Sequence, residues 1–566
     1  MNGLTASSSR AQISRAAIER LYIAMRHLFI RGSYKPLGVS GDAMIKALLE
    51  LKPEIYGSIA DPEKLELSGL LYIFQRLPQG IEECAFVKHI SREGFENSPN
   101  PAIIPAKRRR NCYRIDKDQM YIEMTRGRSD IYDVLTHLTF MYIEAEKIRR
   151  NALDHKGRPK RDWIKLEEIV KKIENNEEHD PKLGFTYLST LIGRTYEETE
   201  IAYQQFRDSS KVNDLFTIVY WLGYRSINEH LNEEDREISF SSTLREKIGH
   251  HILGTSWAQS IKERLQKEGL LDKPIHIISA NLHSVMNSLF ASKVLAGKLK
   301  TREFYKIVEE LSSASDNSMQ TMVQKEAQKN VMFQMEDNSG VNIACQIFDL
   351  SKFDLSSLPD ELCSKGLNEE HKDIVLLVFD YAFGEQAYEL MDELLKPYDK
   401  EGEKIHLNIQ SINIMGKAGI LCGEKGDIMI PDAHIFEGSG NNYYFQNLMG
   451  VDSFQEADLV AYRGSMITVL GTSLQNKDIL NYFLKSSWGA VGLEMEGAHY
   501  QKAIQAASKI RKSITPDVQL RYAYYASDNP LISGATLASG SLGMDGVKPT
   551  YAITREILRG IFTYTG

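Results

Sequence analysis

Residues 491–498 read Val-Gly-Leu-Glu-Met-Glu-Gly-Ala, and the interpretation of the whole sequence begins with them. The apolar residues at the start predict a short buried strand, and the small residues at the end are suited to opening a helix. Glu494 and Glu496 stand at this junction, separated by Met495. In α/β proteins ligands bind outside the carboxyl ends of the strands, so these three side chains are well placed for a binding site.

The two glutamates support two interpretations. Side chains alternate along an extended segment, so Glu494 and Glu496 are expected to share one side and Met495 to take the other. A carboxylate can accept two hydrogen bonds from a cis-diol, and a thioether packs on the apolar face of a sugar ring. Acidic residues are equally typical of a helix N-terminus, where the helix dipole favours them. The stretch alone does not choose between these.

A second acidic strand end follows near the C-terminus. Residues 525–530 read Tyr-Ala-Ser-Asp-Asn-Pro, directly after a hydrophobic run. Asp528 could hold a proton for a purine ring nitrogen, because a protonated base leaves more easily from an oxocarbenium-like transition state. Alone, Ser527 and Asp528 fit a turn equally well. Together with residues 491–498 they favour a site.

The chain after Asp272 alternates between short β-rich runs and helical runs. This pattern indicates a largely parallel sheet covered by helices. A polar helical stretch at residues 301–334 looks like an insertion after the first strand. The expected strands are residues 275–278, 374–378, 405–409, 427–430, 466–469, 491–493 and 520–524.

The first half of the chain has a different pattern. Apolar residues recur at three- and four-residue spacing, for example over residues 17–28 and 131–143, which predicts amphipathic helices. A chain of 566 residues is too long for one core. We therefore expect a mainly α-helical domain at residues 1–266 and an α/β domain at residues 267–566.

Composition argues against several classes of protein. A net charge of −8 does not suit a general nucleic-acid binder, which needs a basic surface. The five cysteines form no C-x-x-C pair, which fits a reducing compartment and predicts no zinc or other metal site. The sequence has no apolar run of the ~18 residues that a membrane span needs, and no secretory signal. We expect a cytoplasmic protein that binds no membrane and needs no cofactor.

One basic cluster stands out, the run Lys-Arg-Arg-Arg at residues 107–110. No clear periodicity follows it. We interpret it as a solvated loop in preference to a phosphate or nucleic-acid contact.

Residues 494–498, followed by Ser527 and Asp528, resemble the nucleoside phosphorylase superfamily, which includes methylthioadenosine/S-adenosylhomocysteine nucleosidases, purine nucleoside phosphorylases and AMP nucleosidases. The run at residues 527–531 is most similar to AMP nucleosidases. The resemblance covers most of the chain after Asp272 and implies a nucleoside phosphorylase-like α/β/α domain with a mixed, largely parallel sheet. Three further segments fall in the family order: a Gly turn opening a helix at residues 383–387, a Gly-x-Ala-Gly turn and Gly-Asp strand at residues 414–430, and a base-contacting loop at residues 464–475.

The resemblance assigns roles to the residues of both acidic strand ends. Glu496 would bind the ribose hydroxyls, and Met495 would pack on the sugar. Asp528 would be the general acid at the purine N7, with Ser527 helping to place it. The other expected substrate contacts are Glu494 and, against the base, Phe436 or Leu474.

The first departure from the family pattern concerns the group that activates water. The nucleosidases carry a glutamate after their first strand, whereas residues 277–284 contain no carboxylate. His283 could act as the base, with Asn281 orienting the water or an anion. His283 equally suits the start of a helix, bonded to the backbone.

The second departure is Lys417, which replaces the small hydroxyl residue usual in the Gly-x-Ala-Gly turn. A lysine beside backbone N–H groups, here next to Gly416, is a natural phosphate site. It could hold inorganic phosphate, a substrate 5′-phosphate or an internal carboxylate. Arg463 is a second candidate cation.

Together these features predict a purine nucleosidase, which hydrolyses the N-glycosidic bond of an adenine nucleoside or nucleotide in the manner of an AMP nucleosidase. Phosphorolysis with inorganic phosphate is the alternative within enzymes. A nucleotide-binding sensor with little turnover is the alternative outside them, because the expected glutamate is missing. By analogy with the superfamily we expect a homo-oligomer.

Overall fold

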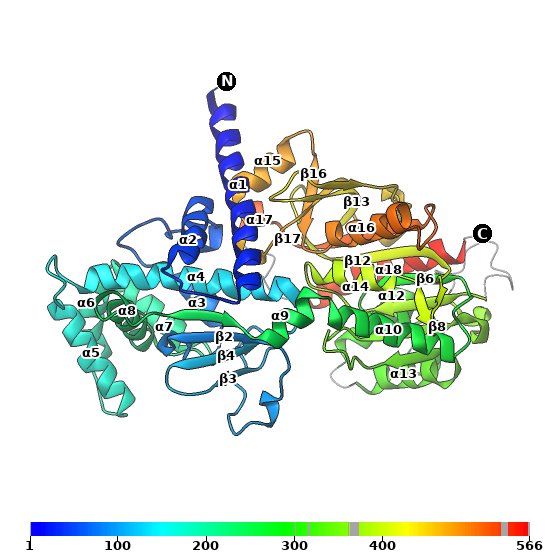
Figure 1. Cartoon of the computed structure of the whole chain (residues 1–566). Coiled ribbons are helices and arrows are strands. Elements are labelled where there is room, and N and C mark those ends of the chain that lie inside the picture. Colours follow the sequence, from blue (N-terminus) through cyan, green and yellow to red (C-terminus); the bar gives the residue numbers. More distant parts are fainter. Residues whose placement is uncertain are drawn as a thin grey trace. The chain divides into compact units, whose positions relative to one another are not determined.

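The computed structural model describes residues 2–299, 301–314, 317–359, 362, 373–533 and 542–563, with side chains from residue 10 onward except at 330 and 533. The chain forms two compact units, Met1–His250 with Ser473–Ile479, and His251–Thr472 with Leu480–Gly566. The expected division at residues 266/267 falls instead inside helix α10 (Ile252–Lys267), which belongs to the second unit because it packs against α14 (Gln386–Leu394). Figure 1 labels the elements.

Helices make up most of the first unit, as the apolar spacing predicts. The periodic stretch at residues 17–28 lies in α1, and the stretch at residues 131–143 lies in the buried helix α4. Both helix predictions are confirmed. The helices are α1 (Asn2–Arg31), α2 (Val39–Leu51), α3 (Leu67–Phe74), α4 (Gly127–Ala152), α5 (Arg161–Glu174), α6 (Pro181–Ile192), α7 (Tyr196–Arg207), α8 (Leu215–Leu231) and α9 (Ser242–Gly249).

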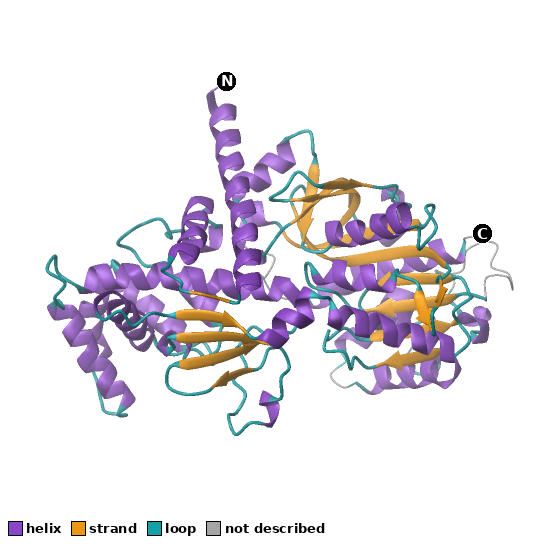
Figure 2. Cartoon of the chain, in the orientation of Figure 1, coloured by secondary structure: helices purple, strands orange, loops and turns teal. Residues whose placement is uncertain are grey.

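The first unit also contains a β-sheet that the sequence analysis does not predict. Figure 2 shows strands in both units. The order of this sheet is β1-β5-β2-β4-β3, and β2 pairs in parallel with β4 and β5. The strands are too short to give a clear alternating pattern between the helices. They are β1 (Ser33–Tyr34), β2 (Phe86–Ile90), β3 (Cys112–Arg114), β4 (Gln119–Glu123) and β5 (Glu237–Phe240).

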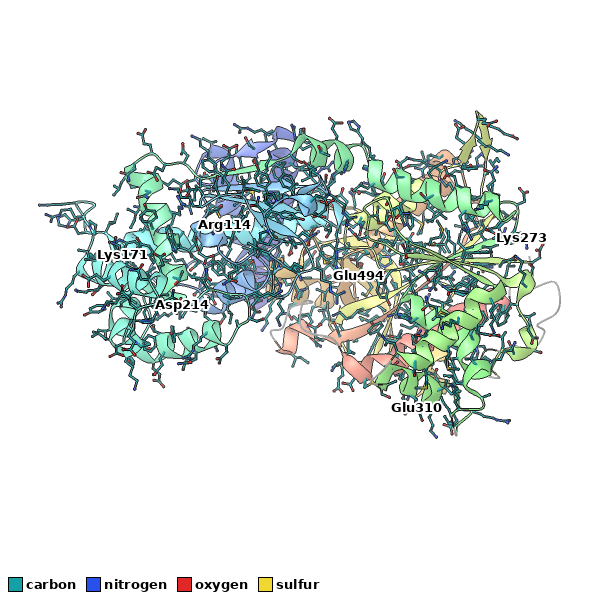
Figure 3. All side chains as sticks on the ribbon, turned by 90° about the horizontal axis from the view of Figure 1, so that it is seen from below. Arg114, Lys171, Asp214, Lys273, Glu310 and Glu494 are labelled. Atoms are coloured by element: carbon teal, nitrogen blue, oxygen red, sulfur yellow. The ribbon has the colours of Figure 1, made fainter. Side chains whose placement is uncertain are left out.

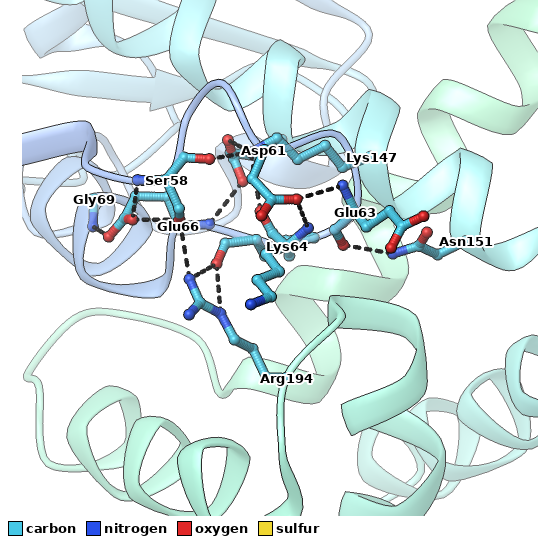
Figure 4. A network of polar contacts seen from close by, with 11 residues as sticks. Ser58, Asp61, Glu63, Lys64, Glu66, Gly69, Lys147, Asn151 and Arg194 are labelled. Atoms are coloured by element: carbon cyan, nitrogen blue, oxygen red, sulfur yellow. Dashed lines mark hydrogen bonds and ion pairs between the residues drawn. The ribbon is translucent and has the colours of Figure 1, made fainter. Parts of the chain in front are cut away.

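Buried polar contacts hold the loop before α3 against the helices of the first unit (Figure 4). The ammonium of Lys147, on α4, donates to the carbonyl oxygens of Ser58 and Lys64 at 3.0 Å each. Glu66 accepts from the backbone N–H of Ser58 at 2.8 Å, and Arg194 donates to the Ser58 hydroxyl at 2.9 Å. The loop thereby satisfies its backbone groups without regular secondary structure.

The basic run at residues 107–110 is only partly solvated, so the prediction of a solvated loop is wrong for half of it. Arg110 is buried and pairs with Asp130 at 2.9 Å and with Asp133 at 3.6 Å, both on α4. Arg108 pairs with Asp133 at 3.2 Å. Burial alone would raise the pKa of Asp133, but His137, Arg108 and Arg110 hold it well below its ordinary value. The arginines fasten this loop to α4.

The second unit contains a mixed sheet in the order β14-β13-β15-β16-β12-β6-β9-β8-β7, with β17 paired to β12 and β13. Parallel pairs join β9, β6, β12 and β17, and a second parallel group joins β13, β15 and β16. Antiparallel pairs link the two groups and form the edges. The strands are β6 (Ile275–Ser279), β7 (Met332–Met335), β8 (Cys345–Asp349), β9 (Val375–Phe379), β12 (Ile409–Ile420), β13 (Ile428–Phe436), β14 (Asn442–Tyr444), β15 (Ala461–Thr468), β16 (Ala490–Glu494) and β17 (Gln519–Asp528), with a separate hairpin of β10 (Tyr398–Lys400) and β11 (Glu403–Ile405).

Helices cover both faces of this sheet (Figure 1). Neighbouring sheet residues face opposite ways: Ile277 joins the core under α10, α14 and α16, and Ile278 joins the core under α11, α12, α13 and α18. The insertion expected at residues 301–334 forms α12 and α13 and then enters strand β7. The remaining helices are α11 (Leu282–Leu295), α12 (Phe304–Ser313), α13 (Ser318–Asn330), α15 (Lys477–Lys485), α16 (Gly497–Gln505), α17 (Pro530–Ser533) and α18 (Val547–Phe562).

Two local predictions for the second unit are wrong. The strand expected at residues 405–409 is instead a connection from the end of β11 to the start of β12. The Gly-x-Ala-Gly segment does not form a turn. Strand β12 continues through it, with only a shift in pairing register after Ala418. Within the described residues, no helix combines the length and apolarity needed to span a membrane.

The buried arginine of the first unit gives a stability prediction. Replacing Arg110 with Ala leaves Asp130 and Asp133 short of a buried partner, so the free energy of unfolding should fall by about 3–5 kcal/mol. The exposed neighbour Arg109, replaced by Ala, is the matched control and should change it by less than about 0.5 kcal/mol. Denaturant unfolding of the full chain measures both. Equal effects of the two substitutions would show that the buried ion pairs contribute nothing specific.

Candidate active site

Strand β12 places the two acidic strand ends next to each other. Its residue Gly419 pairs with Leu493 of β16 on one side and with Asp528 of β17 on the other. Two strand spacings separate the outer strands, roughly 10 Å. Glu494 and Asp528 therefore end the two strands that flank β12, although they lie far apart in the sequence.

Glu494, labelled in Figure 3, has its carboxyl group fully occupied by the protein. It is 2 % exposed, and it accepts hydrogen bonds from the Thr468 hydroxyl and from the backbone N–H groups of Glu496 and Gly497 at the start of α16. Burial and the nearby Glu496 carboxylate raise the pKa of Glu494 above its ordinary value. The helix-start interpretation therefore describes Glu494 better than the expected substrate contact.

Glu496 is only partly buried, and it is not part of the strand. Strand β16 ends at Glu494, and Glu496 has φ −121° and ψ −27°, so strand alternation does not set the directions of the two glutamates. The Glu496 carboxylate accepts from the N–H of Gly384 at 2.9 Å, within the segment where the resemblance implies a Gly turn. Met495 is buried, at 6 % exposure. Glu496 thus combines a fixed carboxylate with access to solvent.

Behind the glutamates lies a buried pair that the sequence analysis does not identify. The Tyr524 hydroxyl lies 3.2 Å from Nε2 of His434, and burial with the charge of Glu494 raises the pKa of Tyr524. Burial lowers the pKa of His434 to about 3, so both rings stay neutral. A Cβ at Gly497 would lie 2.2 Å from the His434 ring, so only glycine fits there. This close approach explains the small residue after Glu496.

Asp528 sits at an irregularity in the sheet. The pairing register of β17 shifts at Ser527, whose hydroxyl donates to Asp528 at 2.5 Å and contacts the carbonyl oxygen of Ala418 at 3.1 Å. Ser527 is thus in direct contact with the carboxylate of Asp528. Burial lowers the pKa of Lys417, and the negative charge of Asp528 opposes this shift. Lys417 and Asp528 are therefore close enough to interact electrostatically.

A hollow of about 530 Å³ opens beside Lys417. Its floor carries Asn281 and His283 at the start of α11, where the Asn281 side chain caps the helix by accepting from the His283 N–H at 2.9 Å. The described lining includes no carboxylate. The other described lining residues are Ser284, Asn287, Leu311, Ser312, Asn317, Gln320, Tyr525, Leu542, Gly543, Gly546, Val547, Thr550 and Tyr551.

Other expected residues have different surroundings. Arg463 is near the start of β15, and its guanidinium donates to the carbonyl oxygens of Met449 at 3.2 Å and Asn447 at 3.4 Å. The end of β15 nearest the site lies five residues further along the strand, roughly 16 Å from Arg463. Arg463 therefore lies outside the site. Phe436 ends β13, and its ring meets the His499 ring edge-on at 4.8 Å.

Gly416 supports the site through the backbone. It pairs with Tyr524 in the sheet, and an added Cβ would lie 3.3 Å from the Tyr524 ring. Within the described residues, no group of three or more His, Cys, Asp or Glu side chains is arranged to hold a metal ion.

The chain belongs to a family of unknown function (DUF6909), whose model matches residues 42–299 and 299–563. No curated protein matches it. A putative methylthioadenosine nucleosidase from Weissella paramesenteroides is 11% identical, with 51% of this chain and 98% of that chain covered and a TM-score of 0.29. The MTA/SAH nucleosidase of Streptococcus pneumoniae is 12% identical, with 50% of this chain and 99% of that chain covered and a TM-score of 0.30. A futalosine hydrolase mutant of Helicobacter pylori is 10% identical, with 50% of this chain and 98% of that chain covered and a TM-score of 0.30.

The raised pKa of Glu494 predicts how stability depends on pH. Because the folded-state pKa lies above the unfolded value of about 4.3, folding gains most when Glu494 is protonated and loses stability as pH rises through the folded pKa. Glutamine mimics the protonated form: its amide can donate to Thr468 while its oxygen accepts the two N–H groups. Glu494→Gln should match the parent at about pH 4, below the unfolded pKa, and exceed it at about pH 9 in chemical denaturation. An equal loss of stability at both pH values would contradict a protonated Glu494.

Proposed function

We propose that the second unit hydrolyses the N-glycosidic bond of a purine nucleoside or nucleotide and releases the free base. The observation that carries this proposal is the register of Gly419, which sets Asp528 on one side and the strand leading to Glu496 on the other. An acid at the base and a carboxylate at the sugar are the two groups that such a cleavage needs. The resemblance of residues 494–498 and 527–531 to the nucleosidases supports the same assignment.

Asp528 is the proposed general acid. It would give a proton to N7 of the purine as the bond from C1′ to the base nitrogen breaks and the electron pair leaves with the base. Water would then add its oxygen to C1′, and its proton would restore Asp528. The hydrogen bond from Ser527 fixes the acid, which keeps the proton donor in line with the ring.

Glu496 is the proposed ribose ligand. Its position after the end of β16 leaves it partly accessible, and the Gly384 N–H holds it in place. A carboxylate has lone pairs for several donors, so this one could accept from both hydroxyls of a cis-diol. Met495, although buried, adjoins Glu496 and would line the sugar side.

The hollow beside Lys417 favours an anionic substrate. Lys417 is its one charged cation among the described lining residues, and hydroxyl and amide groups make up much of the rest. A phosphate group bound there would interact with the Lys417 ammonium and so weaken the attraction between Lys417 and Asp528. This weaker attraction favours the protonated form of Asp528 that the reaction needs. We therefore propose a nucleoside monophosphate, with adenine as the base.

The same hollow supports phosphorolysis as a second candidate. Inorganic phosphate held by Lys417 could replace water as the nucleophile and yield a sugar phosphate. The choice between the two reactions depends on whether base release requires added phosphate.

Replacing Asp528 with Asn tests the general acid. The amide keeps the shape but cannot protonate N7, so base release should fall by a factor of about 10²–10⁴. The melting temperature should stay close to that of the parent. Asp517→Asn, an exposed acid on the preceding loop, is the control and should leave the rate unchanged. An Asp528→Asn variant that releases base at the parental rate would remove Asp528 from the mechanism.

A further inference from the structure

A chain of hydrogen bonds from the helical insertion holds the imidazole of His283. The Gln320 side-chain nitrogen, on α13, lies 2.9 Å from Nδ1 of His283. The same nitrogen donates to the side-chain oxygen of Asn287 at 3.1 Å, and Asn287 donates back to Gln320 at 3.2 Å. Asn287 also donates to the Tyr551 hydroxyl at 2.8 Å. The His283 ring thus contacts Gln320, which is itself linked through Asn287 of α11 to Tyr551 of α18.

With the side-chain amides of Gln320 and Asn287 oriented as in the structure, this network favours one tautomer of the His283 imidazole. The Gln320 amide has two N–H groups, and they serve the Asn287 oxygen and His283 Nδ1. Nδ1 must then accept, so neutral His283 holds its proton on Nε2. Asn287 likewise uses both of its N–H groups, on Gln320 and Tyr551. Every amide proton of the pair is accounted for, which makes the arrangement self-consistent.

We propose that Gln320 is a positioning residue that keeps the His283 proton on Nε2, so that His283 donates a hydrogen bond to an anionic group of the ligand. His283 lines the same hollow as Lys417, in which no carboxylate lines the described wall. A nitrogen that carries a proton cannot take one from water, so this assignment replaces the role of base that the sequence suggests for His283. The tautomer belongs to the ligand-free protein, and only the identity of the ligand rests on the proposed function.

The insertion thereby acquires a role in ligand selection. Helices α12 and α13 contribute Leu311, Ser312, Asn317 and Gln320 to the lining of the hollow. Asn281 caps α11 and Lys417 lies on β12, so the insertion adds residues from a different part of the chain to the lining and, through Gln320, sets the polarity of His283. An oxyanion of the ligand would meet the Lys417 ammonium and the N–H of His283. A cationic group would find no carboxylate in the described lining, and an apolar group would find a largely polar surface.

Nitrogen-15 NMR of the full chain labelled on histidine tests the tautomer directly. The chain has 14 histidines, and a His283→Gln variant identifies the signals of His283. At about pH 8.5, where an ordinary imidazole is neutral, the parent should show the Nε2–H form. Gln320→Glu can only accept from Nδ1, so it should convert His283 to the Nδ1–H form. Gln328→Glu, an exposed site on the same helix, should leave the tautomer unchanged.

Inorganic phosphate is the probe for the anion. Its addition should shift the Nε2 signal of His283, and Gln320→Glu should weaken phosphate binding about tenfold or more, the loss of one hydrogen bond to a charged group together with added repulsion. Gln320→Ala, which removes the amide without adding charge, guards against a folding defect and should leave mixed tautomers. An Nδ1–H form in the parent, or a tautomer that ignores Gln320, would overturn the proposal. Absence of base release with the predicted tautomer intact would count against the proposed reaction only.

Discussion

The candidate site depends on one constraint in the sheet, the double pairing of Gly419. Strand β12 runs parallel to β17 along most of its length and then meets β16 in the antiparallel direction at its end. Because both neighbours end beside this residue, their terminal acids flank the last part of β12. The extra residue in β17, Ser527, shifts the register there, so that Asp528 pairs with Gly419. Glycine at 416 and 497 lets Tyr524 and His434 close the space behind the acids.

The three acids of the site differ in environment, and this difference separates their roles. Glu494 is buried with its oxygens committed to Thr468 and the start of α16, so it shapes the backbone. Glu496, two residues further along the chain, is partly accessible, and its carboxylate accepts from the backbone N–H groups of Gly384 and Met495. Asp528 lies close enough to Lys417 for its negative charge to oppose the lowering of the lysine pKa by burial. These three environments support the different roles proposed above for Glu496 and Asp528.

The sequence alone predicts those features that rest on local pattern. The strand and helix around residues 491–498, the strand before Asp528, the helices α1 and α4, and the helical insertion all follow from spacing within one segment. Features that depend on distant partners do not. The hydrogen bonding of Glu494 depends on Thr468, and the burial of Arg110 depends on two aspartates of a later helix. The orientation of the His283 ring depends on Gln320. The sheet of the first unit is missed because its strands are only a few residues long.

Detection of free base from the full chain tests the central claim most directly. AMP, adenosine, methylthioadenosine, inosine and guanosine, each with and without inorganic phosphate, would be separated by chromatography after incubation. The account predicts adenine from AMP, more slowly from adenosine, and no need for added phosphate. Release that requires phosphate would make the reaction phosphorolysis. No base from any of the five, with the protein folded and able to bind a nucleotide, would contradict the proposed hydrolysis and favour a nucleotide-binding sensor.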